Sequence, residues 1–194
     1  MPEIVFPYPG GKSRFASRIL EFVPEHRTFV EVFGGAAGVL VDKDPDASNV
    51  EIYNDKDGDL VHFFEVLRED TEELVEWVEQ VPFSRAVHSR WARYYYDGYR
   101  PKDDIPRAGR FFFLRYSQWG AGYGTVNGFA TNKVQSKAQT YANETDRLEE
   151  FAERFRDVVL ENLDWRDVLR KYDSPETDSR DENAQSAARR DRRG

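Results

Sequence analysis

The chain has 194 residues, long enough for one α/β domain with a sizeable insertion and a substantial buried core. Its 36 acidic residues outnumber the 28 basic ones. The absence of cysteine excludes disulfides, thiolate metal ligands and a cysteine nucleophile. The three scattered histidines form no zinc motif, so we expect no metal. No apolar run approaches the ~20 residues of a membrane span and no signal peptide is recognisable, so we expect a cytoplasmic protein with no membrane partner.

The first predicted element is a loop rich in proline and glycine, Pro7–Lys12, whose glycines permit close approach of the backbone to a ligand. Apolar side chains at helical spacing then predict a helix over residues 13–22: Phe15, Ile19 and Phe22. Amide groups in the first turn of this helix favour a bound carboxylate, and Lys12 adds positive charge. The alternative interpretation is a lysine on a solvated first turn.

The stretch Thr28–Leu40, T-F-V-E-V-F-G-G-A-A-G-V-L, is an apolar run that ends abruptly in small residues. Val30, Val32 and Phe33 predict a short buried parallel strand. Three glycines after it allow a tight turn and a close approach to a ligand before a helix begins: Gly34, Gly35 and Gly38. A glycine-rich turn alone is a weak signal, because many strands end in glycine for local reasons.

A second predicted strand, Val50–Asn54, ends in Asp55 about twenty residues later, where doubly wound sheets carry a carboxylate that hydrogen-bonds a ribose. The turn and this carboxylate together predict a nucleotide-type site. Two helices with apolar faces follow, over Asp57–Arg68 and over residues 74–81, and we expect their aromatic side chains in the core. No motif places a carboxylate or nucleophile around His62 or His88, so both are interpreted as structural or surface histidines.

Taken in order, the motifs P-G-G-K, V-E-V-F-G-G-A-A-G-V and I-Y-N-D-K-D-G-D-L resemble the Dam-type class of DNA adenine-N6 methyltransferases, from about Phe6 to about Thr177. The resemblance implies S-adenosylmethionine as cofactor, with Tyr8 and Lys12 at its methionine end and Asp55 on its ribose. The implied cofactor-binding residues are Tyr8, Gly10, Gly11, Lys12, Glu31, Phe33, Gly35, Asp55 and Asp164. One departure is Ala37, where the family often has glycine.

The segment from Ser84 to Asn143 differs from the rest in charge. It holds 10 basic and only 3 acidic residues, a net charge of +7, and aromatic residues are interleaved with its arginines. This composition predicts a nucleic-acid surface; the alternative is a small helical core in which arginine stems cover aromatic rings. R-F-F-F-L-R-Y-S-Q-W-G-A-G-Y-G-T resembles the target-recognition insertion of the family. The predicted DNA-binding residues are Arg107, Arg110, Arg115, Gln118, Trp119, Tyr123, Asn127 and Lys133.

A helix over Thr145–Phe155 and a third strand over Val158–Leu163 are predicted next. The segment E-N-L-D-W resembles the family segment whose aspartate, here Asp164, faces the adenine of the cofactor. A last helical turn is expected over Asp167–Tyr172.

In the family, the phrase Y-D-S-P-x-T is followed by a strand that carries the catalytic D-P-P-Y motif, whereas none of the nine prolines here adjoins another, so no catalytic residue is assigned. A frameshift or premature end of the reading frame, or a split enzyme with a separately encoded C-terminal half, are the two interpretations. Without the missing strand, we expect Thr28–Phe33 to be an edge strand. Residues 178–194 have no large apolar residue and are expected to be disordered.

The predicted fold is α/β, the N-terminal part of a Rossmann-like methyltransferase sheet with a mostly helical DNA-recognition insertion. Predicted boundaries are 1–83 for the cofactor-binding half-domain, 84–143 for the insertion, 144–177 for the return to the methyltransferase domain and 178–194 for the tail. The expected function is site-specific adenine-N6 methylation of double-stranded DNA, with an isolated chain that is inactive. The rival is a non-catalytic remnant that binds DNA or cofactor; a NAD-type dehydrogenase explains neither P-G-G-K nor the basic insertion.

Overall fold

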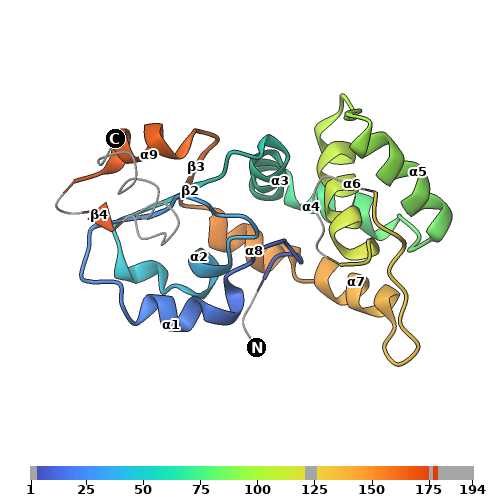
Figure 1. Cartoon of the computed structure of the whole chain (residues 1–194), viewed down its shortest axis with the longest axis horizontal. Coiled ribbons are helices and arrows are strands. Elements are labelled where there is room, and N and C mark those ends of the chain that lie inside the picture. The colour runs from blue at the N-terminus through green and yellow to red at the C-terminus, as the bar shows by residue number, and fades with distance from the viewer. Residues whose placement is uncertain (1–3, 121–125, 175–176, 179–194) are drawn as a thin grey trace, which may run out of the picture. The chain divides into compact units, whose positions relative to one another are not determined.

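The computed structural model of the chain describes residues 4–120, 126–174 and 177–178 (Figure 1). It divides into two compact units. The first, called the sheet unit, comprises Met1–Ile4, Gly11–Val61 and Arg156–Gly194; the second, called the helical unit, comprises Val5–Gly10 and His62–Phe155. The predicted insertion, 84–143, lies inside the helical unit, which also includes residues 62–83 and 144–155. The predicted disordered tail lies outside the described residues from 179 onward.

Four strands form the described sheet: β1 (Thr28–Glu31), β2 (Val50–Asn54), β3 (Val158–Glu161) and β4 (Thr177–Asp178). They lie in the order β3-β2-β1-β4, and every neighbouring pair is parallel. Thr28 of β1 lies opposite Val50 of β2, and Glu51 of β2 lies opposite Val158 of β3. The predicted mixed α/β class with a parallel sheet is therefore confirmed.

The expectation that the first strand lies at an edge of the sheet is wrong. β4 pairs in parallel with the first half of β1, with Thr28 opposite Thr177 and Phe29 opposite Asp178. Asp178, the first residue of the predicted tail, thus belongs to the sheet. The backbone groups at the start of β1 find a partner in this short strand, which reduces the exposure of an otherwise open edge.

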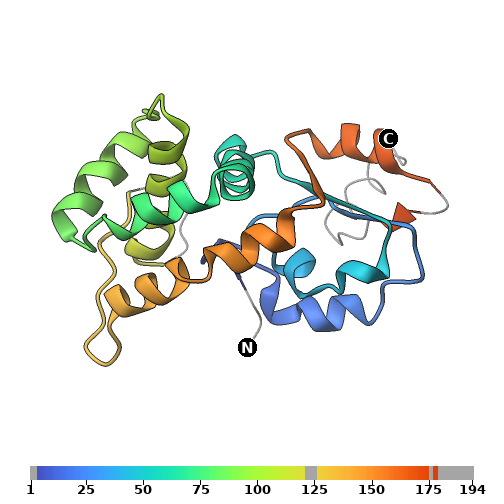
Figure 2. The ribbon, with the colours of Figure 1, turned by 180° about the vertical axis from the view of Figure 1, so that it is seen from behind.

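Helices lie on both sides of the sheet (Figures 1 and 2). α9 (Trp165–Tyr172) packs on one face, where Val168 joins Val30, Val32 and Ile52 in a single buried cluster. α1 (Ala16–Leu20) and α2 (Gly38–Asp42) lie on the opposite side in both views. Side chains alternate between faces along a strand, so β1 and β2 supply apolar groups to both layers.

The predicted helix over residues 13–22 is shorter and less regular than expected. A 3₁₀ turn, η1 (Ser13–Phe15), precedes the single helical stretch of α1, and a second 3₁₀ turn, η2 (Pro45–Ala47), precedes β2. Phe15 and Phe22, two of the apolar residues whose spacing predicted the helix, are 64% and 63% exposed. A 3₁₀ turn has three residues per turn, so it shifts Phe15 out of line with the face of α1 that buries Ala16.

In the helical unit, α6 (Asp104–Ser117) is the central helix, and every residue from Phe111 to Ser117 is buried. Three helices pack against α6: α4 (Thr71–Glu79), α5 (Arg85–Tyr96) and α7 (Lys137–Thr145). α8 (Leu148–Phe155) packs against α4, and the part of α3 (Gly58–Glu69) that belongs to this unit contacts α6 through Phe63. Gly109 lets α6 approach α4 closely, because a methyl group there would collide with the ring of Trp77.

Aromatic rings fill the core of the helical unit. Phe6 meets Phe63 and Phe111 edge to face, with ring centres 5.2 and 5.5 Å apart, and Phe64 stacks on Phe155 at 4.4 Å. These geometries are the favoured arrangements of aromatic pairs. The prediction that the aromatic residues of α3 are core residues is confirmed. None of the described helices combines the length and the apolar character that crossing a membrane requires.

Candidate cofactor and DNA sites

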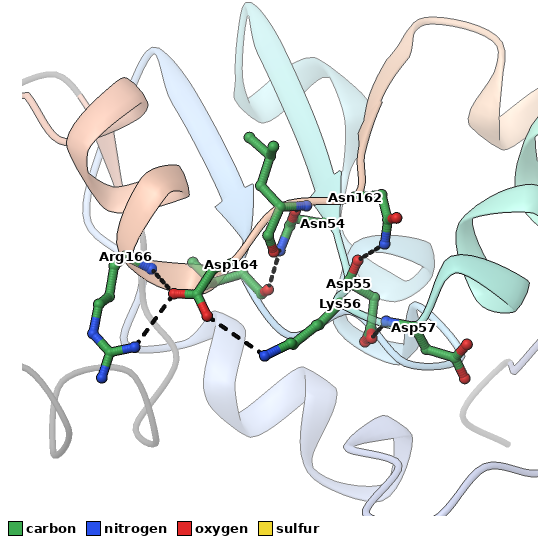
Figure 3. Close-up of polar contacts among 9 residues, drawn as sticks. Asn54, Asp55, Lys56, Asp57, Asn162, Asp164 and Arg166 are labelled. Atoms are coloured by element: carbon green, nitrogen blue, oxygen red, sulfur yellow. Dashed lines mark hydrogen bonds and ion pairs between the residues drawn. The ribbon is translucent and has the colours of Figure 1, made fainter.

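The carboxyl ends of β1, β2 and β3 meet at one edge of the sheet, because the three strands are parallel neighbours. The glycine-rich turn follows β1, Asp55 follows β2, and Asn162 and Asp164 follow β3 (Figure 3). Asn162 joins two of these ends, since its Nδ2 donates to the backbone carbonyl of Asp55 at 2.7 Å. We call this part of the sheet unit the carboxyl edge.

Asn54, the last residue of β2, ties three strand ends together and is 1% exposed. Its Nδ2 donates to the carbonyls of Val32 at 2.8 Å and Leu163 at 3.2 Å, and its Oδ1 accepts from the amide of Leu163 at 2.9 Å. Both halves of the buried amide group are thus hydrogen-bonded. This role was not predicted, although a polar residue that ends an apolar strand directly before Asp55 is a signal for it.

Asp55 joins the end of β2 to the glycine-rich turn. Its Oδ2 accepts from the amide of Gly35 at 2.9 Å, and its Oδ1 accepts from the amide of Asp57 at 2.9 Å. A carboxylate has about four lone-pair positions, so two backbone bonds leave capacity for further donors. Asp55 is partly exposed and lies at the predicted position, where it also holds the turn.

The glycine-rich turn is closely packed against β2. Gly34 lies so near the ring of Tyr53 that a methyl group there would collide with it, and the Tyr53 hydroxyl donates to the Gly35 carbonyl at 2.7 Å. Gly35 has φ +53° and Ala37 has φ +55°. This region of backbone angles is unfavourable for a residue with a side chain, so the departure at Ala37 leaves an alanine where glycine is the better fit.

Glu31, at the end of β1, is buried and accepts at Oε2 from the amide of Leu40 at 3.0 Å. Leu40 lies in the first turn of α2, where amide groups lack a partner within the helix and a negative charge is favourable. Glu31 therefore holds the start of α2 against β1. Its predicted contact with the cofactor stays a prediction.

Lys12 lies beside the end of β1, with its Nζ 3.3 Å from the carbonyl oxygen of Phe33, to which it donates. Phe33 is partly buried and packs against the apolar cluster that Val168 of α9 forms with residues of β1 and β2. Gly11 belongs to the same unit, whereas Tyr8 and Gly10 belong to the helical unit. The structure thus brings Lys12, Phe33 and the glycine-rich turn together, and the predicted role of the other two stays a prediction.

Asp164 caps α9, with its Oδ1 accepting from the amide of Arg166 at 3.1 Å (Figure 3). Two cations are close: Lys56 Nζ is 3.7 Å from Oδ2, and the Arg166 guanidinium is 3.5 Å from Oδ1. The hydrogen bond from the Arg166 amide, together with these charges, outweighs partial burial and lowers the pKa of Asp164 below its ordinary value. The side chain is 31% exposed, so an ionised carboxylate is accessible at the carboxyl edge.

The residues predicted to contact DNA divide between the surface and the core of the helical unit. Trp119 is 66% exposed and Lys133 is exposed, while Arg107 and Asn127 are partly exposed. Tyr123 lies outside the described residues. The accessible members of the set therefore come from α6 and from the segments that follow it.

The other members of the set contact aromatic rings or hydroxyls of the unit itself. Arg115 is 3% exposed, and its guanidinium lies 4.9 Å from the ring centre of Phe111; the guanidinium of Arg110 lies 5.1 Å from the ring centre of Trp91. Gln118 is buried and accepts at Oε1 from the Tyr96 hydroxyl at 3.1 Å. The alternative of arginine stems that cover aromatic rings thus describes part of the segment, and the DNA role of these residues stays a prediction.

A family model of D12 class N6 adenine-specific DNA methyltransferases matches residues 8–177. The chain belongs to this family. The resemblance inferred from the three motifs is thereby confirmed, and DNA is the substrate that the family implies for the methyltransferase chain. Among curated proteins, no relative matches it.

The carboxyl edge of the methyltransferase chain suits the polar groups of S-adenosylmethionine, the cofactor that this family generally uses. Asp55 and Asp164 are accessible hydrogen-bond acceptors at this edge, and Lys12 is a partly exposed cation. Gly34 and Gly35 of the turn are buried, and the Tyr53 ring packs against Gly34. Among residues 4–120, 126–174 and 177–178, no three histidine, aspartate or glutamate side chains gather as a metal site.

Proposed function

We propose that the chain binds S-adenosylmethionine at the carboxyl edge and double-stranded DNA through the helical unit, as the N-terminal part of a Rossmann-like DNA adenine-N6 methyltransferase. The observation that supports this best is the bond between the Gly35 amide and Asp55, which joins a glycine-rich turn to a carboxylate at the next strand end. The order β3-β2-β1-β4 supports it too, because it matches one half of a doubly wound sheet with its crevice at the strand ends.

In this proposal the ribose hydroxyls donate to Asp55, the adenine amino group donates to Asp164, and Lys12 pairs with the carboxylate of the methionine part. The bound cofactor supplies an activated methyl group on a sulfonium. The residues of the chain orient it: hydrogen bonds from Asn54 and Asn162 fix the strand ends from which these side chains project. Orientation of this kind supplies much of the rate in group transfer.

We also propose that residues 1–194 alone do not transfer the methyl group. The amino nitrogen of adenine is a poor nucleophile, since its lone pair is delocalised into the ring. In the family, two acceptors of the D-P-P-Y motif bind its N–H groups and direct the lone pair, and the 194 residues contain no such motif. Activity would then need a segment that supplies these two acceptors.

The second candidate function is binding without catalysis, which the same absent motif favours. Methylation assays separate the two candidates. Transfer of a labelled methyl group from S-adenosylmethionine to DNA by residues 1–194 alone would refute the proposal that these residues are inactive. Recovery of transfer when a segment with a D-P-P-Y strand is added would support a complemented enzyme.

Calorimetric titration with S-adenosylmethionine tests the cofactor site. Asp55→Asn keeps the size of the side chain but removes its charge, so we expect affinity to fall by about tenfold or more, the value of one charge-assisted hydrogen bond. Asp157→Asn is the matched control, because the Asp157 side chain is 89% exposed and lies before the amino end of β3, away from the carboxyl edge. Equal affinity of the Asp55 variant and the parent would remove the ribose assignment.

A further inference from the structure

Two segments of the helical unit pair with each other directly after α6. Gln118 and Phe129 form an antiparallel bridge. The amide of Trp119 donates to the carbonyl of Gly128 at 2.6 Å, and the amide of Ala130 donates to the carbonyl of Ser117 at 2.7 Å. We call residues 117–119 and 127–130 the paired segments. They carry three of the predicted DNA-binding residues, which are Gln118, Trp119 and Asn127.

His88, on the neighbouring helix α5, contacts both paired segments and is 2% exposed. Its Nε2 is 2.9 Å from the backbone carbonyl of Asn127, and its Nδ1 is 2.9 Å from the hydroxyl oxygen of Ser117. A carbonyl only accepts, so Nε2 carries the proton. In the neutral ring Nδ1 is then an acceptor, and the Ser117 hydroxyl donates to it.

The surroundings of His88 favour this neutral form. Burial lowers the pKa of His88 below its ordinary value of 6.5; the bond to Asn127 opposes this effect, and the positive charge of Arg85 adds to it. The ring also packs on Phe129, with ring centres 5.6 Å apart, and the Arg85 guanidinium lies 5.0 Å from the centre of the same Phe129 ring. Residues of α5 thus hold the second paired segment at two points, which are the backbone carbonyl of Asn127 and the ring of Phe129.

An apolar side chain would fill this position without the cost of burying a polar ring. A buried polar group costs free energy unless it is hydrogen-bonded, and its bonds define one geometry more sharply than apolar packing does. Here the two bonds run to two different segments, 29 and 39 residues away along the chain. The imidazole therefore fixes the distance between Ser117 and Asn127. These two residues belong to the paired segments that carry Trp119.

We propose that His88 is a positioning residue for DNA recognition: it holds the paired segments in the one register that presents Trp119 and Asn127 to DNA. The inference rests on the proposed DNA binding by the helical unit. His88 itself touches no base or phosphate in this proposal. Its bond to the Asn127 carbonyl is the more important of the two, because that bond holds the segment that returns toward α5.

Three substitutions separate the two bonds. The amide nitrogen of Gln reaches nearly as far as Nε2, so His88→Gln keeps the donor to Asn127; the shorter His88→Asn replaces Nδ1 and keeps only the contact with Ser117; His88→Phe keeps the ring and neither bond. Tyr141→Phe is the matched control, since it removes one buried bond in the same unit, from the Tyr141 hydroxyl to the Val78 carbonyl at 3.3 Å, away from the paired segments.

Amide hydrogen exchange of the full chain without DNA measures the positioning directly. We expect exchange at Trp119 and Ala130 to become about tenfold faster in His88→Phe and His88→Asn, the loss of roughly one hydrogen bond, and to stay near the parent rate in His88→Gln. Tyr141→Phe should leave these two amides unchanged. Equal exchange at both amides in the parent and His88→Phe would overturn the inference.

DNA binding then tests the consequence. The probes are a duplex selected by the parent chain from a random library and a mixed-sequence duplex of the same length. We expect His88→Phe and His88→Asn to lose about tenfold in the ratio of the two affinities, His88→Gln to restore it, and binding to the mixed duplex to stay within about twofold, because phosphate contacts dominate it.

The outcomes distinguish the two proposals. A parent chain that binds neither duplex refutes DNA binding by the helical unit, and the recognition role of His88 fails with it. A parent chain that binds both, together with an unchanged affinity ratio in His88→Phe, overturns the role of His88 alone. A uniform loss on both duplexes that Tyr141→Phe reproduces would show a merely structural histidine and would also overturn it.

Discussion

The sheet unit and the helical unit hold their predicted functional residues in different ways. At the carboxyl edge, the side chains predicted to meet the cofactor also bond to backbone amides: Asp55 to that of Gly35, Glu31 to that of Leu40 and Asp164 to that of Arg166. In the helical unit, two of the predicted arginines lie over aromatic faces, as Arg110 does over Trp91 at 5.1 Å. The first pattern is directional, and the second is not.

This difference decides how well a substitution can isolate function. A carboxylate that accepts a backbone bond supports the fold and the ligand together, so its removal weakens both. An arginine over an aromatic ring contributes mainly packing and a cation–π attraction, which an exposed lysine lacks. In the helical unit, the buried and the exposed cations are therefore different residues, and single substitutions can test them separately.

The largest effect that we expect comes from the carboxyl edge. Asn54→Ala leaves the Leu163 amide and the Val32 carbonyl without their partner in a buried site, so the free energy of unfolding should fall by about 3 kcal/mol. Urea unfolding measures this. Asn162→Ala, which removes an exposed bond to the Asp55 carbonyl, is the control and should cost less than about 1 kcal/mol. A similar loss for both variants would contradict the buried tie.

A smaller effect separates the two kinds of cation in the helical unit. Lys133→Ala should reduce the slope of log Kd against log salt by about 0.9 for one lost phosphate contact, with little change in stability. Arg115→Ala should leave the slope unchanged and lower the free energy of unfolding by about 2 kcal/mol, because it removes a buried stem and a cation–π contact. The measurements are DNA affinity from low to high salt and urea unfolding of the same variants. A flattened salt slope in the Arg115 variant would indicate that Arg115 contacts DNA.

The predictions made from the sequence succeeded where spacing along a strand determines position. The parallel strands, the glycine-rich turn and Asp55 follow from residue alternation and from a turn that only small residues permit. The network around Asn54 could not be predicted, because its partners lie 22 and 109 residues away. The 3₁₀ turn at Ser13–Phe15 was also not predicted, because apolar spacing does not reveal such a turn.

For the helical unit, composition predicts a nucleic-acid surface, and this stays a prediction; composition did not separate the exposed members of the set from the buried ones. Arginine and aromatic residues are as typical of a covered core as of a nucleic-acid surface, so Arg115 and Lys133 are equivalent by charge and opposite by burial. Likewise, His88 had no motif around it, because its partners are a serine and a backbone carbonyl contributed by distant segments. Burial and backbone partners are three-dimensional properties, so composition alone does not reveal them.

The smallest expected effect concerns Ala37, where the chain departs from the glycine of its family. Ala37→Gly relieves a left-handed backbone conformation, a gain of about 1 kcal/mol, and it loses a buried methyl group and some rigidity of the unfolded chain, a cost of about the same size. The free energy of unfolding should change by less than about 0.5 kcal/mol, because these terms oppose each other. Gly35→Ala is the matched comparison at φ +53°, where strain is added and no existing methyl is lost, so it should destabilise by about 1 kcal/mol or more. Urea unfolding of both variants checks the pair. A destabilisation of Ala37→Gly as large as that of Gly35→Ala would mean that the Ala37 methyl packs the turn more tightly than its backbone conformation strains it.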